Sequence, residues 1–297
     1  MRKEKIVVAN TGQNSLSIID IKNNYKTDHI YLDYFLIGPY GVYANHKMDK
    51  IYTTNSYSNS VFKINLSQKK VEDLVLVGKC PTCIKAYNDL ILISNSDSNS
   101  ISVINEYPFK LIENISVGEK PNDIEIDQET GKIYVANSNG CSIEVIDLEK
   151  NKVERIRLKS NPVKIQLEKE FIYILSIQNN GFYNSSNISI LDLKNYKIIK
   201  TLDLKGIFNY MIKLKNKNLV FLSEIESGFL YKFDISKYKV IGKIHIGGMP
   251  NKILYNGNNI LYIANIYNNL VSVVNHKEEK VIKNIKVGLE PNDLIFI

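Results

Sequence analysis

A unit of about 42 residues recurs along the whole chain, and this repeat limits the possible folds more than any other feature. The clearest copy, residues 121–158, contains four segments of alternating apolar and polar residues separated by Gly, Asn, Asp or Ser. Such segments are typical of antiparallel β-strands joined by tight turns. The third segment ends in Asp or Asn in every copy, at intervals of 40 to 45 residues: Asp20, Asn65, Asn105, Asp147, Asp192, Asp234 and Asn275. We interpret these residues as turn formers, because their side chains can bond the backbone two residues further on.

Seven four-stranded units of this length predict an all-β, seven-bladed β-propeller, with strands A to D in each blade. Six of the seven prolines open a strand A, a position where proline is tolerated, and Asn209 takes this position in the sixth unit. We expect a single domain over residues 1–297. Its blades are predicted at 6–32 plus 291–297 (blade 1), 39–77 (blade 2), 81–117 (blade 3), 121–159 (blade 4), 162–205 (blade 5), 209–247 (blade 6) and 250–287 (blade 7).

The two ends of the chain are out of phase with the repeat. The chain starts at a strand B, residues 6–10, and it ends on an extra strand A, residues 291–297. Placing the last strand in blade 1 completes that blade and joins the two ends of the ring. We therefore predict that the C-terminal strand closes the propeller by pairing into the N-terminal blade.

Three of the second strands carry closely related pentapeptides: IYVAN at 133–137, LYIAN at 261–265 and IYTTN at 51–55. Each is followed by a turn rich in Asn and Ser and by a strand similar to Val-x-Val-Ile-Asp. This pattern resembles the YVTN repeats of bacterial and archaeal seven-bladed propellers, and the resemblance covers residues 6–297. It implies a surface or exported protein without a defined reaction, while the more distantly similar lactonase-type propellers are enzymes.

Composition and charge narrow the class of protein. The hydrophobic content of 44% excludes wholesale disorder. The net charge of +7 comes almost wholly from lysines that are spread over outer strands and form no clustered basic patch. Electrostatic binding of single-stranded nucleic acid therefore remains an alternative and not the favoured function. We find neither a signal peptide nor the ~18 consecutive apolar residues of a membrane span. We expect a cytoplasmic monomer, although the family resemblance allows an exported or cell-surface location.

Strands A line the central channel of a propeller, and their alternation predicts which side chains face it. With the opening proline counted as position zero, positions two and four place charged residues of both signs in the channel. This set comprises Asp123, Glu125, Asp293, Lys85, Lys164, Lys213 and Lys252. It predicts either a site for a small zwitterion or anion, or mutual neutralisation with channel water. The same residues are the candidates for a lactonase- or lyase-like site.

The D-to-A and B-to-C loops gather on one side of the ring, which we call the top face. We expect six aromatic residues there: Tyr40, Tyr57, Phe182, Tyr183, Tyr210 and Tyr267. Aromatic rings beside Asn and Ser suit recognition of a protein, peptide or glycan. A tyrosine-rich composition that extends onto the surface explains the same residues equally well.

Three cysteines are predicted on the top face. Cys80 and Cys83 form a CxxC motif, which in other contexts makes a redox disulfide or half of a metal site, and Cys141 lies in the next blade. Here the motif opens a strand, and no histidine is placed to supply a fourth ligand. We interpret the three cysteines as incidental thiols and predict neither a metal nor a cofactor.

No catalytic motif is present: the chain lacks a Gly-x-Ser-x-Gly elbow, a phosphate-binding loop and a His-Glu-x-x-His sequence. We therefore favour a non-catalytic binding or scaffold propeller that presents its top face to a protein, peptide or glycan. A lactonase- or lyase-like enzyme acting at the channel, and a binder of single-stranded nucleic acid, are the two alternatives.

Overall fold

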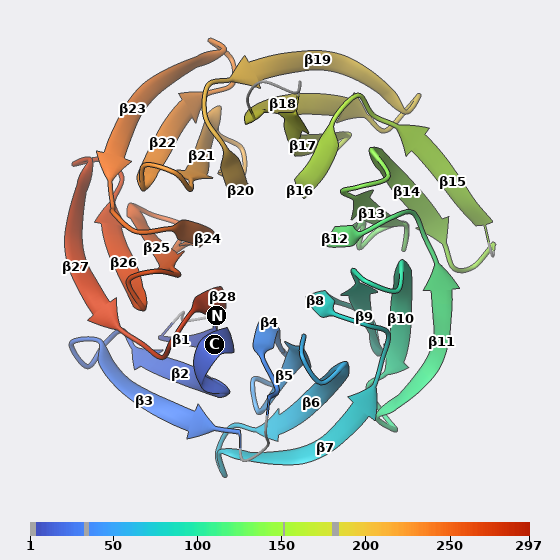
Figure 1. Ribbon diagram of the computed structural model, residues 1–297, viewed down its shortest axis with the longest axis vertical. Coiled ribbons are helices and arrows are strands. Elements are labelled where there is room, and N and C mark those ends of the chain that lie inside the picture. The colour runs from blue at the N-terminus through green and yellow to red at the C-terminus, as the bar shows by residue number, and fades with distance from the viewer. Residues whose placement is uncertain (1–3, 33–35, 151, 180–183) are drawn as a thin grey trace.

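The computed structural model describes residues 4–32, 36–150, 152–179 and 184–297, and these residues form 28 β-strands and one 3-10 helix. The strands make seven four-stranded antiparallel sheets arranged as a ring (Figure 1). The fold is an all-β, seven-bladed propeller, as the repeat predicts. Within the described residues, no helix has both the length and the hydropathy that crossing a bilayer requires.

Six blades are continuous in sequence, and each runs from strand A at the channel to strand D at the rim. Their strands are β4 (Pro39–Ala44), β5 (Lys50–Asn55), β6 (Ser60–Asn65) and β7 (Lys70–Leu76) in blade 2; β8 (Pro81–Tyr87), β9 (Leu90–Asn95), β10 (Ser100–Asn105) and β11 (Lys110–Ser116) in blade 3; β12 (Pro121–Ile126), β13 (Ile133–Asn137), β14 (Ser142–Asp147) and β15 (Lys152–Arg157) in blade 4; β16 (Asn161–Glu168), β17 (Phe171–Asn179), β18 (Asn184–Asp192) and β19 (Lys197–Leu204) in blade 5; β20 (Phe208–Lys213), β21 (Leu219–Glu224), β22 (Phe229–Asp234) and β23 (Lys239–His245) in blade 6; and β24 (Pro250–Tyr255), β25 (Ile260–Asn265), β26 (Leu270–Asn275) and β27 (Lys280–Lys286) in blade 7.

Blade 1 joins the two ends of the chain. Its sheet has the order β28 (Pro291–Phe296), β1 (Lys5–Asn10), β2 (Ser15–Asp20) and β3 (Lys26–Tyr31), and the helix η1 (Thr11–Gln13) connects β1 to β2. Lys5 N donates to Ile297 O at 3.2 Å, and Ile297 N donates back to Lys5 O at 3.0 Å. The predicted closure of the ring by the C-terminal strand is confirmed.

The apolar core of the described chain is divided into seven clusters, and each lies between two neighbouring blades. The cluster between blades 7 and 1, for example, packs Ile6, Val8 and Leu294 against Val271 and Val273. Strands B and C are buried on both faces, because each blade contacts a neighbour on either side. Closing the ring therefore adds a packed interface as well as a β-ladder.

The turns between strands C and D follow the local chemistry expected from the sequence. Asp20 Oδ1 accepts hydrogen bonds from the backbone N–H groups of Lys22 and Asn23, at 3.1 and 3.0 Å. Asp234 Oδ1 accepts from Ser236 N and Lys237 N in the same way, at 3.0 and 3.1 Å. These contacts confirm that the repeated carboxylates and amides form turns rather than a catalytic series.

Candidate functional site

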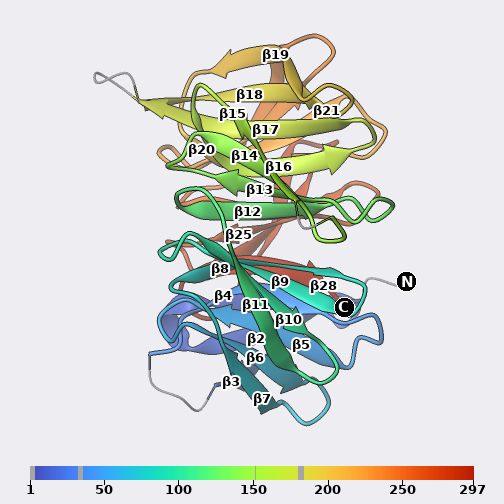
Figure 2. The ribbon, with the colours of Figure 1, turned by 90° about the vertical axis from the view of Figure 1, so that its right-hand side faces the viewer.

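A pocket of about 320 Å³ opens at the end of the channel where the strands A begin. All seven blades contribute to its wall, and Met249 and Ile266 add side chains from a D-to-A and a B-to-C loop. The inner strands run along the axis of the ring, as the side view of Figure 2 shows for β8, β12 and β16, so their first residues gather on one face. The pocket therefore lies on the top face.

Two successive residues of strand A supply most of this wall in six of the seven blades, and blade 2 supplies Tyr40 alone. Positions are counted from Phe208 in blade 6 and from the proline in the other blades. Position two contributes Cys83, Asp123, Lys164, Tyr210, Lys252 and Asp293, and position one contributes Tyr40, Thr82, Asn122, Val163, Asn209, Asn251 and Asn292. Strict alternation would turn position one away from the channel.

A bulge explains why both positions face the pocket. The pairing of strand A with strand B is irregular directly after the opening residue in all seven blades, for example between Pro121 and Asp123. A bulge sets two residues opposite one and re-aims a side chain. Alternation alone therefore missed most of position one, although the Pro-Asn pair repeated at 121–122, 250–251 and 291–292 was a visible signal.

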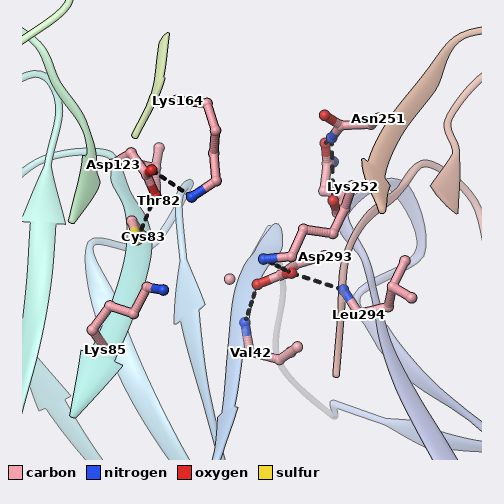
Figure 3. Close-up of polar contacts among 12 residues, drawn as sticks. Val42, Thr82, Cys83, Lys85, Asp123, Lys164, Asn251, Lys252, Asp293 and Leu294 are labelled. Atoms are coloured by element: carbon pink, nitrogen blue, oxygen red, sulfur yellow. Dashed lines mark hydrogen bonds and ion pairs between the residues drawn. The ribbon is translucent and has the colours of Figure 1, made fainter. Parts of the chain in front are cut away.

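Two lysine–aspartate pairs face each other across the pocket. Lys164 Nζ lies 2.5 Å from Asp123 Oδ2, and Lys252 Nζ lies 2.8 Å from Asp293 Oδ1. Figure 3 shows the Lys164 ammonium group turned toward Asp123 and the Lys252 ammonium group turned toward Asp293. A third pair, Lys85 with Glu125 at 3.0 Å, lies at position four, further along the channel.

The two aspartates also connect neighbouring blades through the backbone. Asp123 Oδ2 accepts the N–H of Ile165 in blade 5 at 2.9 Å, and Asp293 Oδ2 accepts the N–H of Val42 in blade 2 at 3.0 Å. Both N–H groups belong to position three of the next strand A. Each carboxylate therefore has a structural role that does not depend on a ligand.

The ring of Tyr210 is shared by both ammonium groups. Its centre lies 5.4 Å from Lys164 Nζ and 5.2 Å from Lys252 Nζ. At these distances the electron-rich face of an aromatic ring attracts a cation. The ring thus lies between two like charges and helps to hold both at the same pocket.

The pocket lysines are charged at neutral pH. Burial alone would lower the pKa of Lys252, but Asp293 outweighs that effect and raises it, and Asp123 raises the pKa of Lys164 in the same way. Burial alone would raise the pKa of Asp123, yet Lys164 and Lys85 hold it below its usual range. Burial, followed by the charge of Asp123, raises the pKa of Cys83 to about 12, so Cys83 is a neutral thiol.

A chain of hydrogen bonds stiffens one side of the pocket rim. Asn209 Nδ2 donates to Asn251 Oδ1 at 2.8 Å, and Asn251 Nδ2 donates to the backbone O of Asn292 at 3.1 Å. Asn292 Nδ2 donates to Thr11 Oγ1 at 2.6 Å, and Thr11 Oγ1 donates to Pro39 O at 2.7 Å. Since a backbone carbonyl can only accept, the direction of this chain is fixed from blade 6 through blades 7 and 1 to blade 2.

Six of the seven predicted channel residues take part in the pairs at positions two and four. Asp123, Asp293, Lys164 and Lys252 line the pocket, and Glu125 and Lys85 pair beyond it. The placement of Lys213 in the channel is wrong. This lysine lies against Glu168, it donates to Lys217 O at 3.0 Å, and its Nζ is 5.0 Å from the ring centre of Tyr173.

The error arises from a shift of one residue in blade 6. Phe208 pairs with Glu224 as Pro121 pairs with Asn137, so Phe208, not Asn209, opens this strand A. Phe208 is buried in the cluster between blades 5 and 6, where an aromatic ring replaces proline at no loss of packing. With this register Tyr210 is at position two and Lys213 at position five.

The predicted top-face aromatic residues divide into three groups. Tyr40 and Tyr210 line the pocket instead of belonging to the surface loops. Tyr57 and Tyr267 are exposed in B-to-C loops, by 59% and 74%. Phe182 and Tyr183 lie outside the described residues.

The three cysteines do not come together as one site. All are free thiols; Cys83 Sγ lies 3.6 Å from Asp123 Oδ1, while Cys141 Sγ contacts Asn161 Oδ1 at 2.8 Å. Cys80 lies in the preceding turn, where its N–H donates to Asn59 Oδ1 at 2.9 Å. Within the described ranges, no three His, Cys, Asp or Glu side chains are grouped closely enough to hold a metal ion.

No protein-family model and no curated protein sequence matches the chain, so the resemblance to YVTN repeats rests on the motifs alone. Solved structures do match. A "putative 6-phosphogluconolactonase" from Bacteroides fragilis has a TM-score of 0.80 at 13% identity, over 99% of this chain and 97% of that one. A protein of unknown function from Desulfotomaculum acetoxidans has a TM-score of 0.78 at 11% identity, over 97% and 99%. Hydrazine synthase of Kuenenia stuttgartiensis has a TM-score of 0.77 at 16% identity, over 88% and 90%. Likeness at these identities shows a propeller fold shared by proteins of varied function.

Proposed function

We propose that this protein is a non-catalytic binding propeller that receives part of a protein, peptide or glycan partner in the pocket at the channel mouth. The observation that carries the proposal is the pocket itself, because every blade contributes to its wall and two charged lysines line it. Its volume of about 320 Å³ lies at the low end of the ~300–1,000 Å³ typical of ligand pockets. A side chain, a chain end or one sugar unit matches that size.

The state of the pocket carboxylates supports binding over catalysis. A general base must have a free lone pair and a pKa near the working pH. Asp123 and Asp293 are already engaged by lysines and by backbone N–H groups, and the pKa of Asp123 is lowered by Lys164 and Lys85 against the effect of its burial. Cys83, with its raised pKa, is a thiol rather than a nucleophilic thiolate.

The surroundings of the pocket suit a partner larger than the pocket. Tyr57 and Tyr267 expose 59% and 74% of their surface on loops of the top face. Exposed aromatic rings provide contact area at a small cost in conformational entropy. In this proposal the pocket holds one group of the partner, and the loops contact the rest.

Peptide and glycan arrays would test the proposal with a variant that fills the pocket mouth. Asn122 is exposed and lines the pocket, so Asn122→Trp places a large ring there without disturbing the core. Gln128→Trp is the matched control, since Gln128 is an exposed residue after the far end of the same strand. We expect ligands of the wild type to bind Gln128→Trp normally and Asn122→Trp at least about tenfold more weakly. Absence of any array ligand, or equal binding by both variants, would refute the proposal.

A further inference from the structure

The pocket is neutral by formal charge but has unequal hydrogen-bonding capacity. Lys164 and Lys252 balance Asp123 and Asp293. Each ammonium group carries three N–H donors, and each carboxylate has about four lone-pair positions. Which groups remain unsatisfied decides what kind of ligand group the pocket attracts.

The carboxylates already have several donors each. Asp123 is contacted by Lys164 Nζ, by Ile165 N and by the Cys83 thiol. Asp293 is contacted by Lys252 Nζ, by Val42 N and by Leu294 N, at 2.8, 3.0 and 2.8 Å. A ligand cation would have to compete with these donors.

The ammonium groups, by contrast, have donors left. Among the described residues, Asp123 Oδ2 is the one acceptor within hydrogen-bond distance of Lys164 Nζ, because Glu125 Oε1 is 3.7 Å away. Lys252 Nζ likewise has Asp293 Oδ1 as its one such acceptor in that part of the chain. Their other close neighbour is the Tyr210 ring, which offers an electron-rich face but no carboxylate oxygen. Two half-satisfied cations therefore face one pocket.

Among the described residues, no rim amide accepts a hydrogen bond from either ammonium group, although Asn209 Oδ1 is buried without a partner. The amides of Asn209, Asn251 and Asn292 are joined to one another and to Thr11, so the rim forms a rigid wall. A preorganised wall lowers the entropic cost of holding a ligand group beside it.

We infer that the pocket binds a carboxylate group of its ligand through Lys164 and Lys252, beside the ring of Tyr210. This inference rests on the proposed binding function and names the chemistry of the group that enters the pocket. Each lysine has an N–H donor to offer a carboxylate oxygen, and such charge-assisted hydrogen bonds are stronger than neutral ones. The lysine–aspartate pairs stay intact, because each lysine uses a donor that Asp123 or Asp293 does not occupy.

A monoanion suits this pocket better than a dianion such as phosphate. The pocket is neutral before binding, so a carboxylate leaves one net negative charge and a phosphate dianion up to two. Lys164 and Asp123 expose only 8% and 10% of their side chains, and uncompensated charge is costly in such surroundings. The carboxylate can belong to a small free acid or to the C-terminus of a peptide.

Titration with defined probes would test this inference. The probes are acetate, N-acetyl-glycylglycine, the C-terminal amide of that peptide, and inorganic phosphate. Binding of each probe is measured by NMR from the side-chain nitrogen signals of Lys164 and Lys252. We expect a carboxylate probe to bind with a Kd of about 1 mM or tighter and to shift both signals. The amide should bind at least about tenfold more weakly, because it lacks the charge that strengthens the hydrogen bonds. Acetate binding alone would indicate a free acid, and binding of the peptide acid alone would indicate a chain end.

Paired substitutions remove each lysine without leaving an unpaired buried carboxylate. Lys164→Met with Asp123→Asn, and Lys252→Met with Asp293→Asn, keep an oxygen that can accept the Ile165 or Val42 N–H. Lys213→Met with Glu168→Gln is the matched control, because that pair is about as buried as Lys164 with Asp123 but lies outside the pocket. Each pocket variant should weaken the carboxylate probe at least about tenfold, whereas the control should stay within about twofold. Lys252→Arg, which keeps the charge, should retain binding and exclude a folding defect as the cause.

The results separate this inference from the proposed function. Equal binding of acid and amide, tighter binding of phosphate than of acetate, or an equal loss in the Lys213 control would overturn the inference. If no carboxylate probe binds while array ligands respond to Asn122→Trp, the inference fails and the binding function stands. If a carboxylate probe binds but no array ligand responds, the inference stands and the larger partner is ruled out.

Discussion

Lys164 and Lys213 are both buried lysines on strands A, 6% and 5% exposed, and each is paired with a carboxylate. We call the Lys213 pair sealed because Glu168, the backbone O of Lys217 and the ring of Tyr173 surround its ammonium group between blades 5 and 6, although Glu168 also borders a different surface pocket. Lys164 has Asp123 and the Tyr210 ring on one side and the pocket on the other. A buried ion pair is therefore not by itself a sign of a binding site. A buried cation that has unused donors and borders a pocket does indicate one.

The difference comes from position along strand A. Lys164 is at position two, directly after the bulge, where side chains turn to the channel. Lys213 is at position five of its strand, and its side chain points between blades. Four experiments test whether the two pairs differ in this way, and they are ordered by the size of their expected effect on stability.

Deleting residues 291–297 should have the largest effect, because it removes the strand that carries Asp293 and leaves the sealed Lys213 pair in place. The deletion exposes the interface around Leu294, which is fully buried, and breaks the ladder between β28 and β1. We expect the free energy of unfolding to fall by more than about 5 kcal/mol, as measured by urea denaturation. Asp293→Asn in the full chain is the control and should cost far less. An unchanged melting temperature after the deletion would contradict the role of the closing strand.

Lys213→Met should have the second largest effect. It leaves Glu168 buried without its cation, which typically costs about 3–5 kcal/mol of unfolding free energy. Adding Glu168→Gln should recover most of this loss, because the buried charge is then removed. Lys164→Met should cost less, because Asp123 keeps two donors, the N–H of Ile165 and the Cys83 thiol, whereas Glu168 keeps one, the N–H of Asn216. If urea denaturation gives equal losses for the two lysines, the distinction between a sealed and an open pair is wrong.

Acidification should destabilise the open pair by an intermediate amount. A carboxyl whose pKa is lowered on folding stabilises the protein above its unfolded-state pKa, and this contribution is lost as the pH falls through the folded-state pKa. Burial alone would raise the pKa of Asp123, but Lys164 and Lys85 outweigh that effect and lower it, so the stabilising contribution of its charge should be lost as the pH falls below about 4. Both Asp123→Asn and Lys164→Met should flatten this part of the stability profile. A profile identical to that of the wild type would show that Asp123 does not titrate in this way.

Cys83→Ala should have the smallest effect. The thiol makes one polar contact, at 3.6 Å to Asp123, and the substitution should change stability by less than about 1 kcal/mol. Because burial raises the pKa of Cys83 to about 12, iodoacetamide should scarcely modify it at pH 8 in the folded protein. Mass spectrometry after labelling checks this, with urea-unfolded protein as the control. Rapid modification of folded Cys83 would indicate a thiolate and reopen a reactive role for the CxxC motif.

Most of the fold was predictable because it is encoded locally and repeated. The Asp and Asn residues at 40- to 45-residue intervals are the last residues of β2, β6, β10, β14, β18, β22 and β26. Their side chains act on the next two or three backbone groups, so their meaning does not depend on distant contacts. Blade 1 was the one unit that lacked a strand A, so the unmatched strand at 291–297 could be assigned to it.

The site was less predictable, and two particular features show why. The bulge after the opening residue brings Asn122 and its equivalents to the pocket, although a period of two turns them away. In blade 6, Phe208 took the place of proline, so counting from Asn209 exchanged the roles of Tyr210 and Met211 and moved Lys213 into the channel. Neither feature has a sequence signal as strong as the turns.

The amino-acid sequence alone is enough to predict a closed ring of seven blades with charges of both signs along its channel. Repeats, turn residues and the phase of the two ends support that conclusion, because they act within or between adjacent segments. Which charges meet, and which hydrogen-bond donors stay free, depends on how the blades pack in three dimensions. Lys164 and Asp123 are 41 residues apart, and whether an ammonium group finds a second acceptor depends on how neighbouring blades pack. The pocket and its two half-satisfied lysines are therefore products of blade packing and not of any single repeat.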